Sequence, residues 1–268
     1  MRQIQQTPDL SNIAKQDLLR AITKRKDDED GWFGDMMPFS DGLCRRNMGL
    51  INGTSLSPDN ALCNSGKNQS PVNIDPAKTF NAQSVRGKPW GIKFNYGLLI
   101  ADSIKNTGNL VQVEARGGNI QVDGIEFELK HLDFHIPSEN TLAGQHFPLE
   151  IQFFHESKNK EQATVSMMIV PGRQSRLLSK LLPELPEVGQ ENRLSANTIR
   201  SIEMEKKIGS YYRYNGSLTK PPCTEGVRWF VMKQNQTMSK EQYQQLKAAI
   251  SVDNNRPVQA LNARMIVE

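Results

Sequence analysis

Histidine is scarce in this sequence, and long hydrophobic runs are absent. Its 268 residues include four histidines, three cysteines and 7% aromatic residues. Because no run of about 18 apolar residues occurs, no membrane-spanning helix is expected. The first residues lack the apolar segment of a signal peptide, so the chain is expected to be cytosolic or to begin at a processed start. The three cysteines match no zinc-finger spacing and allow one disulfide with one thiol left over.

The charge of the chain is typical of an ordinary solvated surface. The formal net charge is +4, and only 37% of the residues are hydrophobic. The low hydrophobic content predicts extensive polar loops or tails around the core. No stripe of basic and aromatic residues occurs, so a nucleic-acid partner is not expected.

Residues 1–50 differ from the rest and are predicted to form an N-terminal extension. Apolar residues recur at helical spacing over about 8–25, and Thr7-Pro8 suits the helix start. The low-hydrophobicity segment that follows resembles a linker. The helix either packs on the body of the protein or docks into a larger assembly through a partner protein, and a membrane surface would fit it equally well. The residues expected to make this contact are Leu10, Ile13, Leu18 and Ile22.

Residues 51–268 are predicted to form one mainly β domain. Short alternating or β-branched segments are punctuated by Gly, Asn, Asp and Pro. The expected strands cover about 91–96, 99–105, 109–115, 119–123, 125–135, 148–155, 163–170 and 227–232. Helices are expected over 175–182, 195–205 and 239–250. The fold class is therefore mainly β, or α+β, with few peripheral helices.

Two of these strands carry the side chains of a candidate metal site. Alternation with period 2 places five residues of the first strand on one face, namely Phe127, Leu129, His131, Asp133 and His135. In the second strand, Glu150, Gln152 and Phe154 share one face. If the two strands are neighbours, Asp133, His135 and Gln152 meet at one point.

Several unusual segments give the chain a family resemblance. They are Lys67-Asn-Gln-Ser-Pro-Val-Asn-Ile74, Pro137-Ser-Glu139, Phe147-Pro-Leu-Glu-Ile151, Gly216-Ser-Leu-Thr-Lys-Pro-Pro-Cys-Thr-Glu-Gly226 and Asn255-Arg-Pro-Val-Gln259. Their order and separation resemble the alpha-class carbonic anhydrases over about residues 47–266. The resemblance implies a central, twisted, largely antiparallel sheet with a conical cavity and a zinc ion at its base.

The ligand set departs from that family. Family members hold Zn²⁺ with three neutral imidazoles, which lower the pKa of a bound water from 15.7 to about 7. Here Asp133, His135 and Gln152 occupy the three positions. A carboxylate should raise the pKa of bound water, and an amide oxygen is a weak zinc ligand. No cofactor is therefore expected, although one histidine, one carboxylate and one amide could hold a harder divalent ion loosely.

Other positions of the resemblance are mixed. Thr219 and Glu139 match the pair that orients the zinc-bound hydroxide, and Glu150 matches the carboxylate behind the third ligand. They are interpreted as a buried hydrogen-bond network that supports the fold. Asn109 replaces the proton-shuttle histidine, and amides carry no protons near neutral pH. Lys220 lies beside these positions, and its ammonium is expected to occupy the space of the lost ion and to pair with Asp133 or Glu150.

The resemblance also pairs Cys63 with Cys223. In bacterial and secreted relatives these positions form a disulfide, which implies an oxidising compartment and hence the periplasm or secretion. This conflicts with the missing signal peptide, and we give the cysteine pair more weight. Cys44 is left unpaired.

Three functions remain open on sequence grounds. The first is a catalytically inactive carbonic-anhydrase-like scaffold whose N-terminal arm docks into a larger assembly. The second is a divergent metalloenzyme, with zinc or another ion, that hydrates CO₂ or hydrolyses esters. The third is a binding module that holds a small anion at Lys220 in a metal-free cavity.

Overall fold

The computed structural model describes residues 58–81, 91–194, 198–200 and 210–268. Several expectations lie outside these ranges: the extension over 1–50, the helix over 8–25, the docking residues Leu10, Ile13, Leu18 and Ile22, and the third cysteine, Cys44. No helix in the described ranges is long and apolar enough to cross a membrane.

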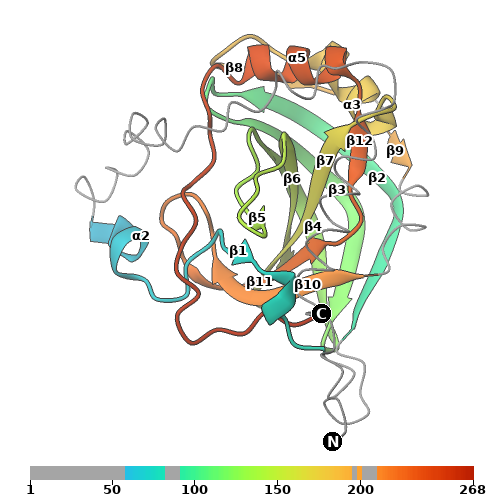
Figure 1. Ribbon diagram of the computed structural model, residues 1–268. Coiled ribbons are helices and arrows are strands. Elements are labelled where there is room, and N and C mark those ends of the chain that lie inside the picture. The colour runs from blue at the N-terminus through green and yellow to red at the C-terminus, as the bar shows by residue number, and fades with distance from the viewer. Residues whose placement is uncertain (1–57, 82–90, 195–197, 201–209) are drawn as a thin grey trace, which may run out of the picture.

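A single large, twisted sheet dominates the described part of the chain (Figure 1). Ten strands form it, and eight of them follow the order β10-β11-β7-β6-β4-β3-β2-β8. Strand β12 pairs with β7, and β9 pairs with β2. The β11–β7 and β12–β7 pairings are parallel and the others are antiparallel. The predicted fold class, mainly β with a largely antiparallel twisted sheet and few helices, is confirmed.

The element bounds are as follows. The strands are β1 (Asn73–Ile74), β2 (Ile92–Asn106), β3 (Val111–Val122), β4 (Ile125–His135), β5 (Thr141–Leu142), β6 (Leu149–Ser157), β7 (Gln162–Pro171), β8 (Gln190–Arg193), β9 (Thr198–Arg200), β10 (Tyr211–Ser217), β11 (Glu225–Met232) and β12 (Gln236–Met238). The helices are α2 (Leu62–Ser65), α3 (Arg176–Leu181) and α5 (Lys240–Ala249), with 3₁₀ turns η3 (Pro58–Asn60), η4 (Pro76–Lys78) and η6 (Leu182–Glu184).

Two long strands replace four short predicted ones. Strand β2 unites the expected segments 91–96 and 99–105, and β3 unites 109–115 and 119–123. The pairing between them shifts register after Tyr96 and again after Ala101. Such β-bulges break the alternation of apolar and polar residues, which imitates a strand end in the sequence.

One helix prediction is wrong where it can be compared. Within the expected helix over 195–205, Thr198–Arg200 forms β9 and pairs with β2. Edge pairing to a long strand overrides the local helical spacing there. Strand β10 was not predicted. The last predicted helix is present as α5, and Ser239 caps it through a capping box with Gln242.

A further β-bulge corrects the predicted faces of β4. Leu129 pairs with His155, whereas His131 pairs with Phe154, so Lys130 is an extra residue. Phe127 and Leu129 are therefore in the hydrophobic core and do not share a face with Asp133 and His135. The prediction that all five residues share one face was wrong because it assumed uninterrupted alternation.

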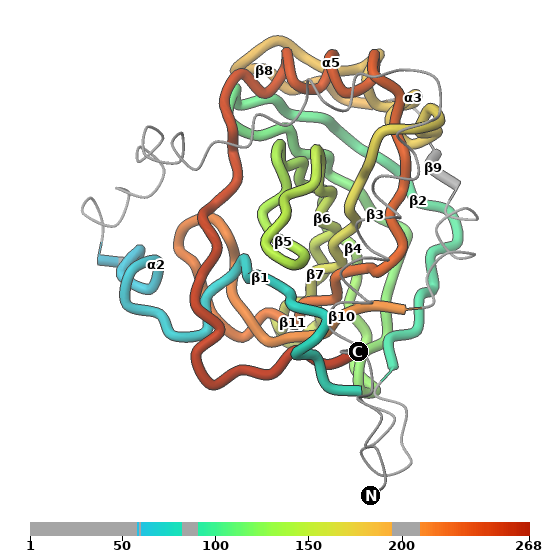
Figure 2. Tube along the Cα trace, viewed as in Figure 1, coloured from blue at the N-terminus to red at the C-terminus, as the bar shows by residue number. Residues whose placement is uncertain are grey.

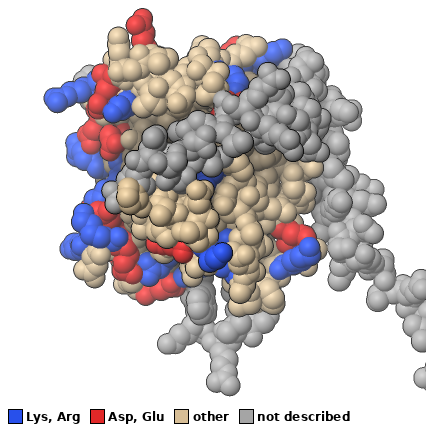
Figure 3. All heavy atoms as spheres, turned by 90° about the vertical axis from the view of Figure 1, so that its left-hand side faces the viewer, with Lys and Arg blue, Asp and Glu red and all other residues tan. Residues whose placement is uncertain are grey.

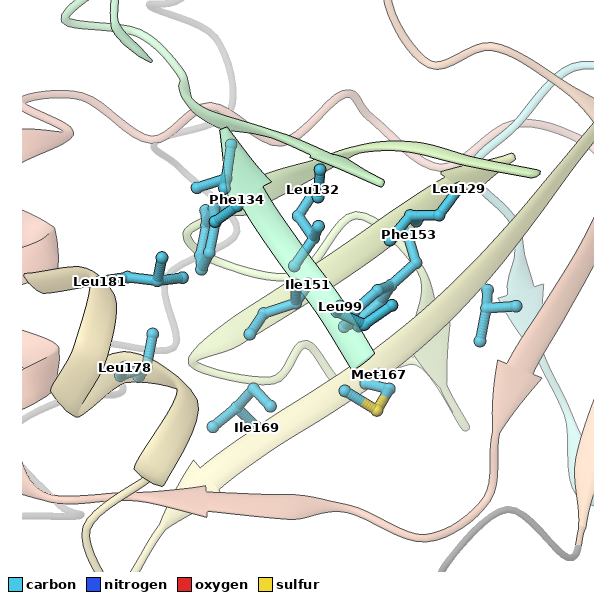
Figure 4. Packing of buried hydrophobic residues seen from close by; sticks show 14 of the residues in the cluster. Leu99, Leu129, Leu132, Phe134, Ile151, Phe153, Met167, Ile169, Leu178 and Leu181 are labelled. Atoms are coloured by element: carbon cyan, nitrogen blue, oxygen red, sulfur yellow. The ribbon is translucent and has the colours of Figure 1, made fainter. Parts of the chain in front are cut away.

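The main core lies on one face of the sheet. Leu129, Leu132 and Phe134 of β4 pack with Ile151 and Phe153 of β6 in one buried cluster (Figure 4). Helix α3 adds two leucines, and α5 adds Leu246 to the same cluster. The leucines of α3 are labelled Leu178 and Leu181 in Figure 4. Because both helices are amphipathic, they close this core at one end of the sheet.

The opposite face holds a smaller cluster at its other end. The rings of Tyr214 and Trp229 stack there, with centroids 5.8 Å apart. The C-terminal segment after α5 runs across the molecule to β10 (Figure 2), where Arg213 bridges to Val267. Between this cluster and the α5 end, the same face carries polar side chains of β4 and β6.

Candidate functional site

Strands β4 and β6 bring the three candidate ligand positions together. Asp133 lies directly opposite Gln152, and His135 lies opposite Glu150. Asp133, His135 and Gln152 are 5%, 6% and 5% exposed, respectively. Their neighbours Leu132 and Phe134 are in the core, so the alternation of the strands aims these polar side chains at the other face.

Asp133 accepts hydrogen bonds from two side chains and contacts a third. The ammonium of Lys220 is 2.8 Å from Oδ2, and the amide of Gln112 donates to Oδ1 at 2.6 Å. Nε2 of His131 lies 3.5 Å from Oδ2. Burial alone would raise the pKa of this carboxyl, but His131 and Lys220 outweigh it and hold the pKa well below its usual range. Asp133 is thus an ionised, neutralised carboxylate.

Gln152 belongs to a second hydrogen-bond network, which contains Glu139 and Glu150. Its side-chain nitrogen donates to Glu139 at 2.7 Å and to Glu150 at 3.2 Å. Glu150 also accepts from Ser166 and from the side chain and backbone of Asn140. Burial, followed by the charge of Glu139, raises the pKa of Glu150. An amide nitrogen therefore occupies the space between two buried glutamates.

In the polar floor that Asp133, His135, Glu150 and Gln152 form, His135 has no hydrogen bond at either ring nitrogen. Both of its ring nitrogens are buried and have no hydrogen-bond partner among the described residues. Nδ1 lies 3.5 Å from Oε1 of Glu139, at the limit of a weak polar contact. An unpartnered buried imidazole is unusual, because buried polar atoms are normally satisfied.

The remaining predicted residues are placed less centrally. Thr219 is partly buried and makes no hydrogen bond to Glu139, whose carboxylate accepts from Gln152 and from the backbone nitrogen of Arg256. Asn109 is exposed in the turn between β2 and β3. The expected support of Glu139 by Thr219 is thus replaced by the Gln152 amide.

Sequence reasoning missed Gln112, whose bond to Asp133 is among the shortest in the site. It pairs with Asp133 across β3 and β4, so the two side chains share a face. The signal was available: Gln112 stands between Val111 and Val113, which are both core residues. His131 was predicted to share a face with Asp133, and its neighbours are Asp133 and the stacked ring of Phe154.

The predicted disulfide is confirmed. Cys63 and Cys223 are joined, and the Cys223 backbone nitrogen donates to the carbonyl of Lys220 at 3.0 Å. Arg256 donates to the carbonyl of Cys63 at 2.8 Å and to Gln69 and Ser70. The disulfide and Arg256 thus fix the loop that carries Lys220. Such a bond is compatible with an extracellular or periplasmic location.

One face of the surface shows no patch of a single charge. Lys and Arg alternate with Asp and Glu along its charged side, and much of the remainder is neutral (Figure 3). On this face the described residues therefore agree with the solvated surface expected from the net charge.

Comparison with solved structures shows that the mixed sheet, with its polar floor on β4 and β6, has the alpha-carbonic anhydrase fold. Residues 57–268 match the eukaryotic-type carbonic anhydrase family, and the chain belongs to that family.

Three relatives illustrate the match. The carbonic anhydrase of Neisseria gonorrhoeae is 38% identical over 216 residues, covering 80% of this chain and 82% of the relative. The alpha-carbonic anhydrase of Thermovibrio ammonificans, solved with the inhibitor sulfanilamide, has a TM-score of 0.72 at 37% identity, over 82% of this chain and 95% of that one. A dioscorin solved with ascorbate has a TM-score of 0.72 at 32% identity, over 85% and 95%.

The side chains present do not fit the zinc ion that the resemblance implies. Three neutral imidazoles are needed, and only one of the three positions supplies one. Asp133 is held by Lys220 and Gln112, while the Gln152 nitrogen is bonded to two glutamates. In the described ranges, no group of three or more His, Cys, Asp and Glu side chains is arranged to hold a metal.

Proposed function

We propose that this protein is a carbonic-anhydrase-like scaffold that no longer hydrates CO₂. The observation that carries the proposal is the ion pair between Lys220 and Asp133, at 2.8 Å. It places a positive charge and an ion-paired carboxylate where hydration chemistry needs an open, electrophilic metal. Asn109 adds a second deficit, because the family's proton carrier at this position is a histidine.

A direct test measures metal content and CO₂ hydration on the same unchelated sample of the full chain. We expect near-zero zinc by plasma mass spectrometry and no hydration above the buffer rate in stopped flow, with a folded protein by circular dichroism. The carbonic anhydrase of Neisseria gonorrhoeae is the positive control. One metal ion per chain, together with hydration that His135→Ala abolishes, would establish the metalloenzyme alternative instead.

We also propose that residues 1–50 bind a partner protein in a larger assembly. The support is the apolar stripe of the sequence, which a larger assembly would bury. Removal of residues 1–50 is expected to abolish co-migration with that assembly in size-exclusion chromatography while the folded domain remains intact. We propose the periplasm or secretion as the location, in keeping with the disulfide.

A second candidate, a small-anion binding module, is supported by the exposure of Lys220. Its side chain is 43% exposed, so its ammonium can also contact a ligand that enters the cavity. A related dioscorin has been solved with ascorbate. Thermal stabilisation by ascorbate or bicarbonate, lost in Lys220→Ala, would favour this function. No stabilisation by either anion would reject it.

A further inference from the structure

Asp133 needs a positive charge close to it. Its side chain is only 8% exposed, and an isolated carboxylate at that depth is strongly destabilised. Gln112 contributes a hydrogen bond without charge, and His131 lies at 3.5 Å from the carboxylate. Among the side chains named here, Lys220 brings a full positive charge into direct contact with Asp133, with its ammonium 2.8 Å from the carboxylate.

His135 supplies a second, independent observation. Its residue is 6% exposed, and neither ring nitrogen has a partner in the described chain. One nitrogen of a neutral imidazole carries a lone pair, which is a good ligand for a divalent ion. His135 is two residues from Asp133 on β4 and shares its face, so this lone pair belongs to the same site.

Gln152 completes the set from β6. The nitrogen of an amide is its only donor, and here it points at Glu139 and Glu150. The oxygen of the same amide is therefore left for another donor or for a cation. Since Gln152 pairs directly with Asp133, one nitrogen and two oxygen ligands are brought to one place.

We propose that the Lys220 ammonium is the built-in cation of this site, and that it excludes a divalent ion from a latent site formed by Asp133, His135 and Gln152. The inference rests on the proposed metal-free function. Lys220 then determines whether an ammonium or a divalent ion neutralises the charge of Asp133. The lost imidazoles explain weak zinc binding, whereas Lys220 explains why a harder ion does not enter in its place.

The backbone keeps Lys220 in position. Its carbonyl accepts from the nitrogen of Cys223, and Cys223 is tied to Cys63 by the disulfide. The carbonyl of Thr224 accepts from the nitrogen of Leu218, which closes the same loop. Shortening the side chain would thus remove the ammonium without moving the loop, and it would open a path for water and an ion to Asp133.

The test titrates Co²⁺ and Zn²⁺ into the full-length wild type and Lys220→Ala, with binding followed by calorimetry and by thermal shift. We expect Lys220→Ala to bind Co²⁺ at least tenfold more tightly than the wild type, at one ion per chain, with a rise in melting temperature. Lys220→Arg keeps the charge and should gain nothing. Lys130→Ala, which removes a lysine paired with Glu128 on the outer surface, is the matched control.

Two double variants assign the gain to the proposed ligands. Adding Asp133→Asn or His135→Ala to Lys220→Ala should abolish the new Co²⁺ binding. If Lys220→Ala does not fold, Lys220→Met, which keeps the aliphatic stem, takes its place in every comparison. Equal binding by the wild type and the Lys220 variant, both weak, would overturn this inference alone. A tightly bound ion in the wild type would overturn both the inference and the proposed function.

Discussion

The two histidines near the ends of the β4–β6 pairing show what burial does to a single side chain. His135 faces the polar floor, and His155 faces the core, where it is fully buried and stacks on Tyr96. The Tyr96 hydroxyl lies 2.6 Å from its Nε2. Burial lowers the pKa of His155 to about 3, so the folded protein keeps this imidazole neutral.

His155 should therefore make stability depend on pH. In the unfolded chain its pKa returns to about 6.5, so between that value and about 3 the unfolded state binds one proton more. Stability contributed by neutral His155 is complete above pH 6.5 and is lost as pH falls, by up to about 1.4 kcal/mol per pH unit. Urea unfolding of the wild type and His155→Leu at pH 7, 6 and 5 measures this.

The informative quantity is the slope of unfolding free energy against pH. His155→Leu also removes one hydrogen-bond partner of Tyr96, so its stability is expected to be lower at every pH. Its slope should nevertheless be shallower by about one proton than that of the wild type. Equal slopes would show that His155 is not the group that titrates.

At the scale of the element, the extra residue Lys130 decides which side chains reach the site. Up to Leu129 the inward side chains of β4 fill the core, and from His131 onward the residues of the same parity line the polar face. A one-residue change of register exchanges the two faces of a strand. Before the bulge the core side chains of β4 are Phe127 and Leu129, and after it they are Leu132 and Phe134, which leaves Asp133 and His135 on the face of the site.

Deleting Lys130 should prevent folding. Without it, either Phe127 and Leu129 or Asp133 and His135 must change face, which exposes large apolar groups or buries charged ones. We expect no cooperative thermal transition in near-ultraviolet circular dichroism. Lys130→Ala keeps the bulge and loses only an exposed ion pair, so its stability should change by at most about 0.5 kcal/mol. A deletion variant that melts like the wild type would show that the bulge is dispensable.

The same bulges set the limit of prediction from sequence. The fold class and the positions of Asp133, His135 and Gln152 could be predicted, because whole segments resemble one family. Alternation failed wherever a strand contains a bulge, as at Lys130 and after Tyr96, since the extra residue lies in the pairing and not in the composition. Gln112 was overlooked because its importance comes from the strand opposite it.

At the scale of the whole molecule, hydrogen bonds join segments that are distant in sequence. Ser70 donates from its backbone nitrogen to Ser217 at 2.9 Å, and the hydroxyl of Ser70 accepts from the Ser217 backbone at 3.1 Å. Arg256 bonds to the carbonyls of both Ser70 and Cys63. The beginning, the middle and the end of the domain therefore meet behind the loop that carries Lys220.

The disulfide should be a large part of the stability of this junction. Cys63 and Cys223 are separated by 160 residues, and a loop of that length gives a chain-entropy estimate of about 5 kcal/mol. We expect the Cys63→Ser/Cys223→Ser double variant to lose about 3–5 kcal/mol in urea unfolding. Cys44→Ser controls for the loss of a thiol and should match the wild type.

Because the bond acts on the unfolded chain, adding a reductant should destabilise the wild type to the level of the double variant and leave that variant unchanged. If reductant affected both proteins equally, the stabilisation would not come from this bond.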